Sequence, residues 1–371
     1  TNASFTEAAN SAITLTFDKV MQVADASGIV ITKNNATAVN ITNIAVGSSP
    51  TQLVITTDAT MTASDYFKVA CGTTSIKSQA NTALDANELF VGGSGANNIG
   101  LGSYSSSVPV FVRANGGGDV IVGTSGADNL NAGGGSDTVT GGMGADTIVL
   151  NESGTKAVDI VKVVDANGNL GSLPGMMDTI ITFDVSGTAT NDRLSLPSAA
   201  IAPDTGGYAN GTDVGVFKSH SITSGIVTFG SADSGTPLMV TAGNLGDAIG
   251  YLSQNLNLPG KTVGFHADTD GNGYTDSLYV FQDGGPNDVL LLLAEVNGVT
   301  LINGADAQNA VRIIDQTGPI ATGATLLANG VSISFNELLA STVDFAGLSM
   351  QHGSGATLAA MSVSGVTVSA N

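Results

Sequence analysis

Four aspartates recur at intervals of nine residues: Asp119, Asp128, Asp137 and Asp146. They occupy the same position in four consecutive nine-residue units, ANGGGDVIV, GTSGADNLN, AGGGSDTVT and GGMGADTIV. Carboxylates held side by side repel each other unless a hard divalent cation takes them as ligands, and calcium binds about six to eight oxygen atoms in such sites. The regular spacing therefore predicts calcium binding.

Each unit has a glycine-rich half and a half of the form Asp-x-U-x, where U is a large apolar residue. The apolar positions are Ile121, Leu130, Val139 and Ile148. Glycine tolerates positive φ and close approach of neighbouring backbones, so the glycine-rich half predicts a turn and the other half a short strand. A fixed short period predicts a solenoid whose turns stack over one continuous core.

Two units would complete one coil, so residues eighteen apart would lie above one another at the strand spacing of about 4.8 Å. Asp119 would then pair with Asp137, and Asp128 with Asp146. The alternative is a flexible linker rich in glycine and aspartate that binds no metal. Four consecutive matches favour the solenoid over this alternative.

The repeats resemble the RTX family, the calcium-binding repeats-in-toxin proteins that Gram-negative bacteria export by type I secretion. The close match covers about a tenth of the chain. The resemblance implies that turn carbonyls join two aspartates at each calcium site. One implied site uses Ala114, Gly116 and Asp119 with Gly133, Gly135 and Asp137. The other uses Gly123, Ser125 and Asp128 with Gly142, Gly144 and Asp146.

The repeat pattern weakens upstream of these units. The segment GGSGANNIG carries Asn97 where aspartate is expected, and the degenerate LGSYSSSVP and a four-residue interruption follow it. We expect residues 92–109 to form a metal-poor cap, although Asn97 could supply a neutral oxygen.

The composition agrees with an exported β protein of two to four domains. Acidic residues number 31 against 11 basic residues, for a net charge of −20. An acidic surface repels phosphate, so nucleic acid is not an expected partner. The single cysteine, Cys71, excludes an intramolecular disulfide and lies in FKVACGT, where a buried apolar thiol is expected. No apolar run reaches the length of a transmembrane helix, and no N-terminal signal pattern is present.

The fold class that we predict is all-β: a parallel β-roll flanked by immunoglobulin-like sandwich modules, with one short helix. Residues 1–90 alternate in short apolar runs separated by turn residues, which is typical of a sandwich. The roll would span 91–157, and a β-rich region over 158–314 would continue or cap it. Residues 315–371 would form a partial second sandwich that starts after the linker DQTGP.

The helix is predicted from Leu245, Ile249, Leu252 and Leu256, which fall at helical spacing and should pack against a sheet.

A second candidate calcium loop offers oxygens at alternate positions: Asp268, Asp270, Asn272 and Asp276. It half-resembles the start of an EF-hand but lacks the glutamate at position twelve and the flanking helices. An acidic loop built on Asx turns, with no metal, is the alternative.

Three further aspartates after the repeats have two possible roles, as calcium ligands or as solvated turn residues: Asp178, Asp184 and Asp192.

The sequence lacks the usual signatures of an enzyme. Neither His-Glu-x-x-His nor Gly-x-Ser-x-Gly occurs. His220, His266 and His352 stand without companions at metal-ligand spacing, and we expect them to be ordinary surface or turn residues. We therefore expect no catalytic activity.

The segments YLSQNL, DSLYVFQDG and VLLLLAEVNGVTL resemble the C-terminal β region of RTX surface-layer proteins. This resemblance implies an extracellular, calcium-dependent structural protein of the bacterial cell surface that self-associates into a surface layer or filament. The alternatives are the stalk or ligand-binding region of an RTX adhesin, and the non-catalytic region of a secreted hydrolase. Cell-surface polysaccharide is a further candidate partner. We expect the partial C-terminal sandwich to be completed by a neighbouring subunit, or else to be part of a longer chain.

Overall fold

The computed structural model describes most of the first 315 residues and four strands beyond them. The described ranges are 2–21, 28–71, 88–104, 109–152, 156–164, 168–186, 191–233, 235–273, 275, 277–284, 287–296, 299–304, 310–315, 321–327, 330–335, 350–354 and 357–361. The chain divides into two compact units, Thr1–Gln316 and Thr317–Asn371.

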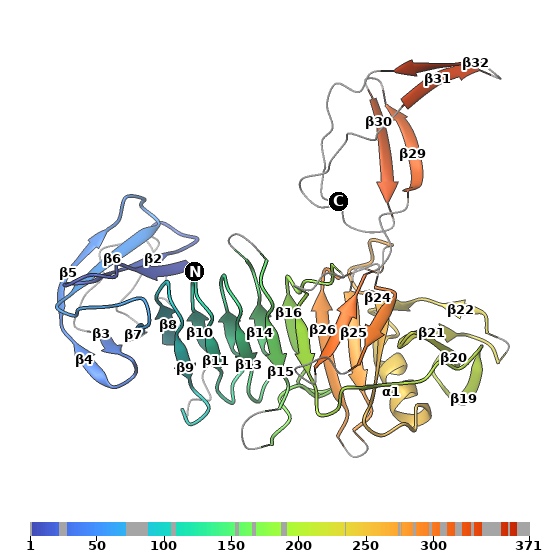
Figure 1. Ribbon diagram of the computed structural model, residues 1–371, viewed down its shortest axis with the longest axis horizontal. Coiled ribbons are helices and arrows are strands. Elements are labelled where there is room, and N and C mark those ends of the chain that lie inside the picture. Colours follow the sequence, from blue (N-terminus) through green and yellow to red (C-terminus); the bar gives the residue numbers. More distant parts are fainter. Residues whose placement is uncertain are drawn as a thin grey trace. The chain divides into compact units, whose positions relative to one another are not determined.

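Two ladders of short parallel strands form the centre of the first unit (Figure 1). The first ladder contains β8 (Glu88–Gly92), β10 (Val110–Arg113), β12 (Asn129–Asn131), β14 (Thr147–Val149) and β16 (Asp178–Ile181). The second ladder contains β9 (Asn98–Gly100), β11 (Val120–Val122), β13 (Thr138–Thr140), β15 (Ile160–Lys162) and β17 (Arg193–Ser195). The chain alternates between the ladders, so each coil adds one strand to each. This confirms the parallel β-roll.

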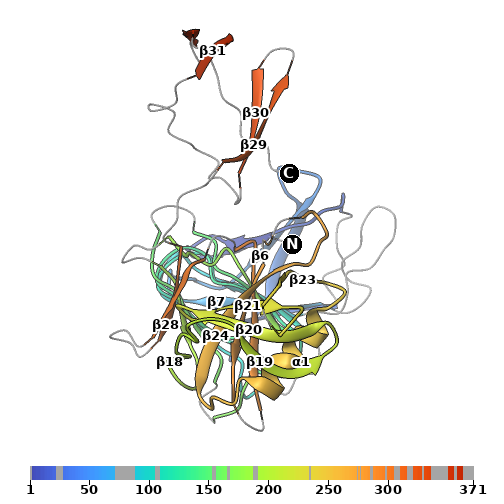
Figure 2. The ribbon, with the colours of Figure 1, turned by 90° about the vertical axis from the view of Figure 1, so that its right-hand side faces the viewer.

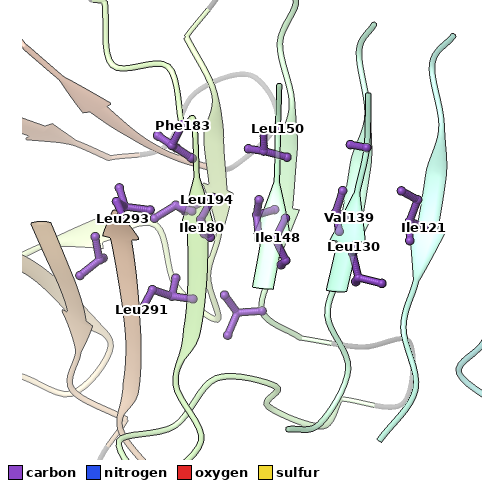
Figure 3. Close-up of a cluster of buried hydrophobic side chains, with 14 of the residues drawn as sticks. Ile121, Leu130, Val139, Ile148, Leu150, Ile180, Phe183, Leu194, Leu291 and Leu293 are labelled. Carbon is purple, nitrogen blue, oxygen red and sulfur yellow. The ribbon is translucent and has the colours of Figure 1, made fainter. Parts of the chain in front are cut away.

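The register of the ladders follows the repeat. Ile121 pairs with Val139, and Leu130 pairs with Ile148, so residues eighteen apart are neighbours. All four side chains are fully buried and point between the two rows of strands (Figure 3). Burial of each such side chain contributes about 1.5–3 kcal/mol. The apolar position of the repeat therefore builds the core of the roll.

The roll extends past the repeats in both directions. Upstream, β8 and β9 make a complete coil, in which Phe90 pairs with Val112 and Ile99 with Ile121. Residues 92–109, which we expected to cap the roll, therefore include strand β9 within its stack. The physical reason is that Asn-x-Ile retains the strand half of the repeat although aspartate is missing.

The N-terminal segment forms two antiparallel layers over a shared apolar core. Its strands are β1 (Asn2–Phe5), β2 (Ala12–Thr16), β3 (Ile29–Lys33), β4 (Thr37–Val39), β5 (Ile41–Val46), β6 (Gln52–Thr57) and β7 (Tyr66–Cys71). One layer has the order β1-β2-β6-β5, and the other has the order β4-β3-β7. Strand β7 pairs with β8, so the second layer is continuous with the first ladder of the roll. The immunoglobulin-like character of this segment stays a prediction.

A mixed region follows the roll and extends both ladders. Its strands are β18 (Ala200–Ile201), β19 (Ala209–Val214), β20 (Phe217–Thr223), β21 (Ile226–Gly230), β22 (Pro237–Leu238), β23 (Val240–Thr241), β24 (Lys261–Asp268), β25 (Ser277–Gln282), β26 (Val289–Ala294), β27 (Leu301–Asn303) and β28 (Val311–Ile314). Strand β26 joins the first ladder beside β16, and β28 ends the parallel run of the second ladder by pairing antiparallel with β17.

Helix α1 (Leu245–Asn255) is the short helix that the apolar spacing predicts. It lies beside β19 and β20 (Figure 2). Its residues Tyr251 and Leu252 are buried in a second core that includes Phe217, Phe229 and Phe265. The expected packing of the helix against a sheet is therefore confirmed.

The histidine expectation is wrong for two residues. His220 lies on β20, is 7% exposed and has Nδ1 3.1 Å from the Tyr251 hydroxyl. His266 lies on β24, with Nε2 3.0 Å from the carbonyl oxygen of Val299. The apolar neighbours of each histidine place it in a strand that packs into the interior, rather than in a loop. The side chain of His352 lies outside the described residues.

In the second unit, the described strands form two antiparallel hairpins. They pair β29 (Ala321–Leu327) with β30 (Gly330–Phe335), and β31 (Met350–Ser354) with β32 (Thr357–Met361). The prediction of a partial second sandwich is not tested by these strands alone.

Neighbouring residues on β11 test the inward and outward faces of the roll. Ile121 is fully buried, whereas Val120 is 42% exposed. Ile121→Ala should lower the free energy of unfolding in calcium by about 2–5 kcal/mol, because it leaves a cavity in the core. Val120→Ala, the matched control, should change it by less than about 0.5 kcal/mol. Equal losses in chemical denaturation would contradict this orientation.

Candidate metal centre

The repeat aspartates line the two turn edges of the roll. Asp119 and Asp137 immediately precede strands of the second ladder, and Asp128 and Asp146 precede strands of the first. Each of the four is at most 2% exposed. Burying a carboxylate is costly unless a partner compensates its charge. The roll therefore concentrates unfavourable charge along each edge.

Hydrogen bonds join the aspartates of successive coils. The main-chain N–H of Asp119 donates to Oδ1 of Asp137 at 2.7 Å, and that of Asp128 donates to Oδ1 of Asp146 at 2.8 Å. The aspartates eighteen apart are thus direct neighbours. We call the stack of Asp119 and Asp137 the first column and the stack of Asp128 and Asp146 the second column.

The four aspartates differ in the hydrogen-bond partners of their second carboxylate oxygen, Oδ2. Oδ2 is buried and has no hydrogen-bond partner among the described residues in Asp119, Asp137 and Asp146. In Asp128, by contrast, Oδ2 accepts the main-chain N–H of Thr124 at 2.6 Å and its hydroxyl at 3.0 Å. A cation would supply the partner that three of these four carboxylates lack.

Glycine allows the turns of successive coils to approach each other. A Cβ atom at Gly133 would lie 1.9 Å from the carbonyl oxygen of Asn115, and one at Gly142 would lie 1.9 Å from that of Thr124. Both glycines have positive φ, of 90° and 107°. A side chain at either position would force the turns apart and separate the oxygen atoms that line each column.

The main-chain oxygens that the resemblance implies as calcium ligands accept none of the inter-coil hydrogen bonds of the described turns. In the described part of the chain, the inter-coil hydrogen bonds of these turns end on carbonyl oxygens such as those of Gly93, Asn115, Thr124 and Gly134. They do not end on the implied ligands, which are Ala114, Gly116, Gly133 and Gly135 at the first column and Gly123, Ser125, Gly142 and Gly144 at the second. This geometry fits a calcium shell, and the individual ligands remain predictions.

Burial shifts the titration of these carboxyls. It raises the pKa of Asp119 and Asp137 to about 7 and that of Asp146 to about 8. Burial also raises the pKa of Asp128, and hydrogen bonds from Thr124 partly oppose this increase. A bound divalent cation favours the ionised form and would reverse these shifts.

Side chains alone do not complete a metal site. Within the described ranges, no group of three or more His, Cys, Asp or Glu side chains could hold a metal ion. An ion at either column would therefore have to combine its carboxylates with main-chain oxygens, as calcium does in turns.

Both columns continue beyond the repeats. In the first column, Asp137 N–H donates to Asp159 at 2.8 Å, and Asp159 N–H donates to Asp192 at 2.9 Å. In the second column, Asp146 N–H donates to Oδ1 of Asp178 at 3.0 Å. All three added aspartates are buried, so Asp178 and Asp192 are not solvated turn residues. Asp159 is not among the candidates from the sequence. It begins an Asp-x-U-x pattern, but no glycine-rich half precedes it.

The first column also continues upstream to Asn97, whose N–H donates to Oδ1 of Asp119 at 2.7 Å. The side-chain NH₂ of Asn97 donates to the carbonyl oxygens of Ala63 and Asp65. Its buried Oδ1 has no partner among the described residues. Asn97 thus places a neutral oxygen where the repeat places a carboxylate. The side chain of Asp184, by contrast, pairs with Lys156 at 2.7 Å, and its main-chain N–H donates to Oδ2 of Asp192 at 2.8 Å.

The candidate loop at Asp268 is closed by its own backbone. The carboxylate of Asp268 accepts the N–H groups of Gly271 at 2.8 Å and Gly273 at 3.0 Å, and Asp270 accepts that of Asn272 at 3.0 Å. These are the contacts of the Asx-turn alternative. Asp276 lies outside the described residues, and calcium at this loop stays a prediction.

Comparison with known proteins supports the metal assignment. Residues 113–148 match the family model of the RTX calcium-binding nonapeptide repeat, in four copies. No curated protein matches the chain. The chain therefore carries calcium-binding repeats, and the calcium prediction is confirmed.

The two columns should lose calcium independently. Asp137→Ala should remove the ion between Asp119 and Asp137 and leave the ion between Asp128 and Asp146 largely in place, because the columns lie on opposite edges of the roll. Asp146→Ala should have the converse effect. Calorimetric titration gives the number of ions bound. A variant that loses both ions or neither would contradict the eighteen-residue pairing.

The stability of the calcium-free roll should fall as pH rises. The folded-state pKa values of about 7 to 8 exceed the value of about 3.9 for an unfolded aspartate, so the folded roll binds more protons. Its stability should therefore decrease between about pH 4 and pH 8, whereas calcium affinity should increase over this range as protons stop competing.

Thermal unfolding in chelator at pH 5 and pH 8, with calcium titrations at pH 6 and pH 8, measures both effects. Asp146→Asn removes one titrating group and should flatten the dependence. A calcium-free melting temperature that increases from pH 5 to pH 8 would contradict the assignment.

Proposed function

We propose that this chain is a calcium-dependent, secreted structural protein that assembles into a bacterial surface layer or extracellular filament. The columns of buried aspartates are the observation that carries the proposal, because they make the central fold depend on the external calcium level. The RTX repeats and their association with type I secretion support export. No helix in the described ranges has the length and apolar character needed to cross a membrane.

The usual affinity of calcium modules explains where such a chain would fold. Extracellular modules bind calcium at about 10⁻⁴ to 10⁻³ M. Calcium at ten times the Kd stabilises each site by about 1.4 kcal/mol, and several sites together can decide whether the roll folds. Such sites would stay empty at low intracellular calcium and fill outside the cell.

The hairpins of the second unit support self-association. A two-stranded sheet is marginally stable in water, and each of its edges presents unpaired main-chain groups. The pairs β29–β30 and β31–β32 are hairpins of this kind. Addition of a strand from a neighbouring chain would satisfy these edges, and a head-to-tail contact of this type can propagate into a filament or sheet.

As part of this structural role, we also propose that the chain is not an enzyme. The two histidines whose side chains are described, His220 and His266, both make interior hydrogen bonds. This supports a packing role for them rather than a role in proton transfer.

The second candidate function is ligand binding within an adhesin, and one cleft favours it. The cleft has a volume of about 480 Å³ and lies between the N-terminal layers and the roll. Its polar lining includes Glu7, Arg113, Asn115, Asn131 and Asn151. Such a lining suits a hydroxyl-rich ligand such as cell-surface polysaccharide.

Electron microscopy of the purified chain distinguishes these functions. Calcium should convert the chain from separate particles into an ordered sheet or filament, and chelator should reverse the change. A chain that stays monomeric in calcium and binds polysaccharide would instead support the adhesin.

Deletion of residues 319–371 tests whether the second unit makes the assembly contact. The deletion should abolish calcium-induced polymers while the roll still orders in calcium, because Thr1–Gln316 is a compact unit by itself. Circular dichroism monitors the roll and serves as the control. Normal polymers from the shortened chain would refute strand addition through this unit.

A further inference from the structure

The first column keeps an unsatisfied carboxylate one coil beyond the repeats. Asp159 precedes β15, and its Oδ1 accepts the N–H of Asp137 at 2.8 Å. The residue is 1% exposed, and its Oδ2 has no hydrogen-bond partner in the part of the chain that the structure describes. Asp159 therefore repeats the arrangement of Asp119 and Asp137, but at a spacing of 22 residues rather than eighteen.

In the coil of Asp159, the side chain of a glutamate replaces a turn carbonyl as the acceptor of an inter-coil hydrogen bond. Within the repeats, the N–H of Gly117 donates to the carbonyl oxygen of Gly134 in the next coil at 2.8 Å. One coil later, the equivalent N–H of Gly135 donates to Oε2 of Glu152 at 3.1 Å. Oε1 of Glu152 accepts the N–H of Ala157 at 3.3 Å, which holds the carboxylate over the turn.

Negative charge accumulates around these two residues. Asp159 is close enough to Glu152, Asp137 and Asp192 for their charges to repel one another. Lys156 lies in the same connection, but it is exposed and pairs with Asp184 at 2.7 Å. A hydrogen bond from a main-chain N–H does not neutralise this charge, whereas a divalent cation would.

We propose that Glu152 and Asp159 form an additional calcium site beyond the nonapeptide repeats. The two carboxylates bind the ion, and main-chain oxygens of the turn at residues 132–135 contribute to the rest of its shell. The ion joins the last repeat coil to the first coil that lacks a glycine-rich turn. This extends calcium-dependent folding into β15, where the repeat pattern no longer indicates it.

Two isosteric variants test the site by calcium stoichiometry. Glu152→Gln removes the charge but keeps an oxygen that can accept the Gly135 N–H. Asp159→Asn likewise removes the charge but keeps an oxygen that can accept the Asp137 N–H. Each should bind one calcium ion fewer than the unaltered chain and retain the ions of the repeats. Asp184→Asn, which removes the negative charge that pairs with Lys156 and keeps the main-chain N–H that donates to Asp192, is the matched control and should leave the number unchanged. Unchanged stoichiometry in both test variants would overturn the proposal.

Anomalous scattering from calcium-containing crystals of the unaltered chain gives a second test that does not depend on how the variants fold. An ion should lie about 2.3–2.6 Å from oxygens of both Glu152 and Asp159. Occupied repeat sites with no ion at this position would overturn the proposal. That result would leave calcium binding by the repeats, and the proposed assembly, unaffected.

Discussion

The structure depends on holding buried carboxylates in register from one coil to the next. Strand pairing fixes successive coils at a spacing of about 4.8 Å, which brings aspartates of like charge together. One oxygen of the carboxylate accepts a main-chain N–H from the preceding coil. The N–H of Asp119, for example, donates to Asp137. Among the described residues, the other oxygen has no hydrogen-bond partner in most cases, including Asp119, Asp137 and Asp146. Calcium balances this arrangement, because it takes carboxylate and carbonyl oxygens together.

This metal-dependent stack lies in the middle of the first unit rather than at its end. The first ladder continues through β7 and β8 into the N-terminal layers and through β16 and β26 into the aromatic core around α1. The coils share one apolar core with this later region, through Ile148, Ile180 and Leu291 (Figure 3). Loss of calcium should therefore loosen strands that contain no calcium ligand. We therefore expect calcium to act as a folding signal for the whole unit.

The sequence predicts the centre of the fold better than its surroundings, for a physical reason. A strict nine-residue period determines which residues stack, so the pairing of Ile121 with Val139 follows from counting alone. Asp159 and Asp192 occupy the same column, but separations of 22 and 33 residues hide them from a periodic search. The pairing of β7 with β8 is equally hidden, because pairing between segments leaves no local pattern. His220 shows a third limit, since a polar residue in a strand can enter the core when a partner such as Tyr251 satisfies it.

Hydrogen exchange over residues 114–149, with calcium and with chelator, tests the central claim most directly. The main-chain N–H groups of Asp119 and Asp128 are informative, because each donates to the aspartate one coil later. We expect strong protection of these amides in calcium and rapid exchange in chelator at neutral pH. Equal protection in both conditions would contradict the claim that calcium holds the roll together.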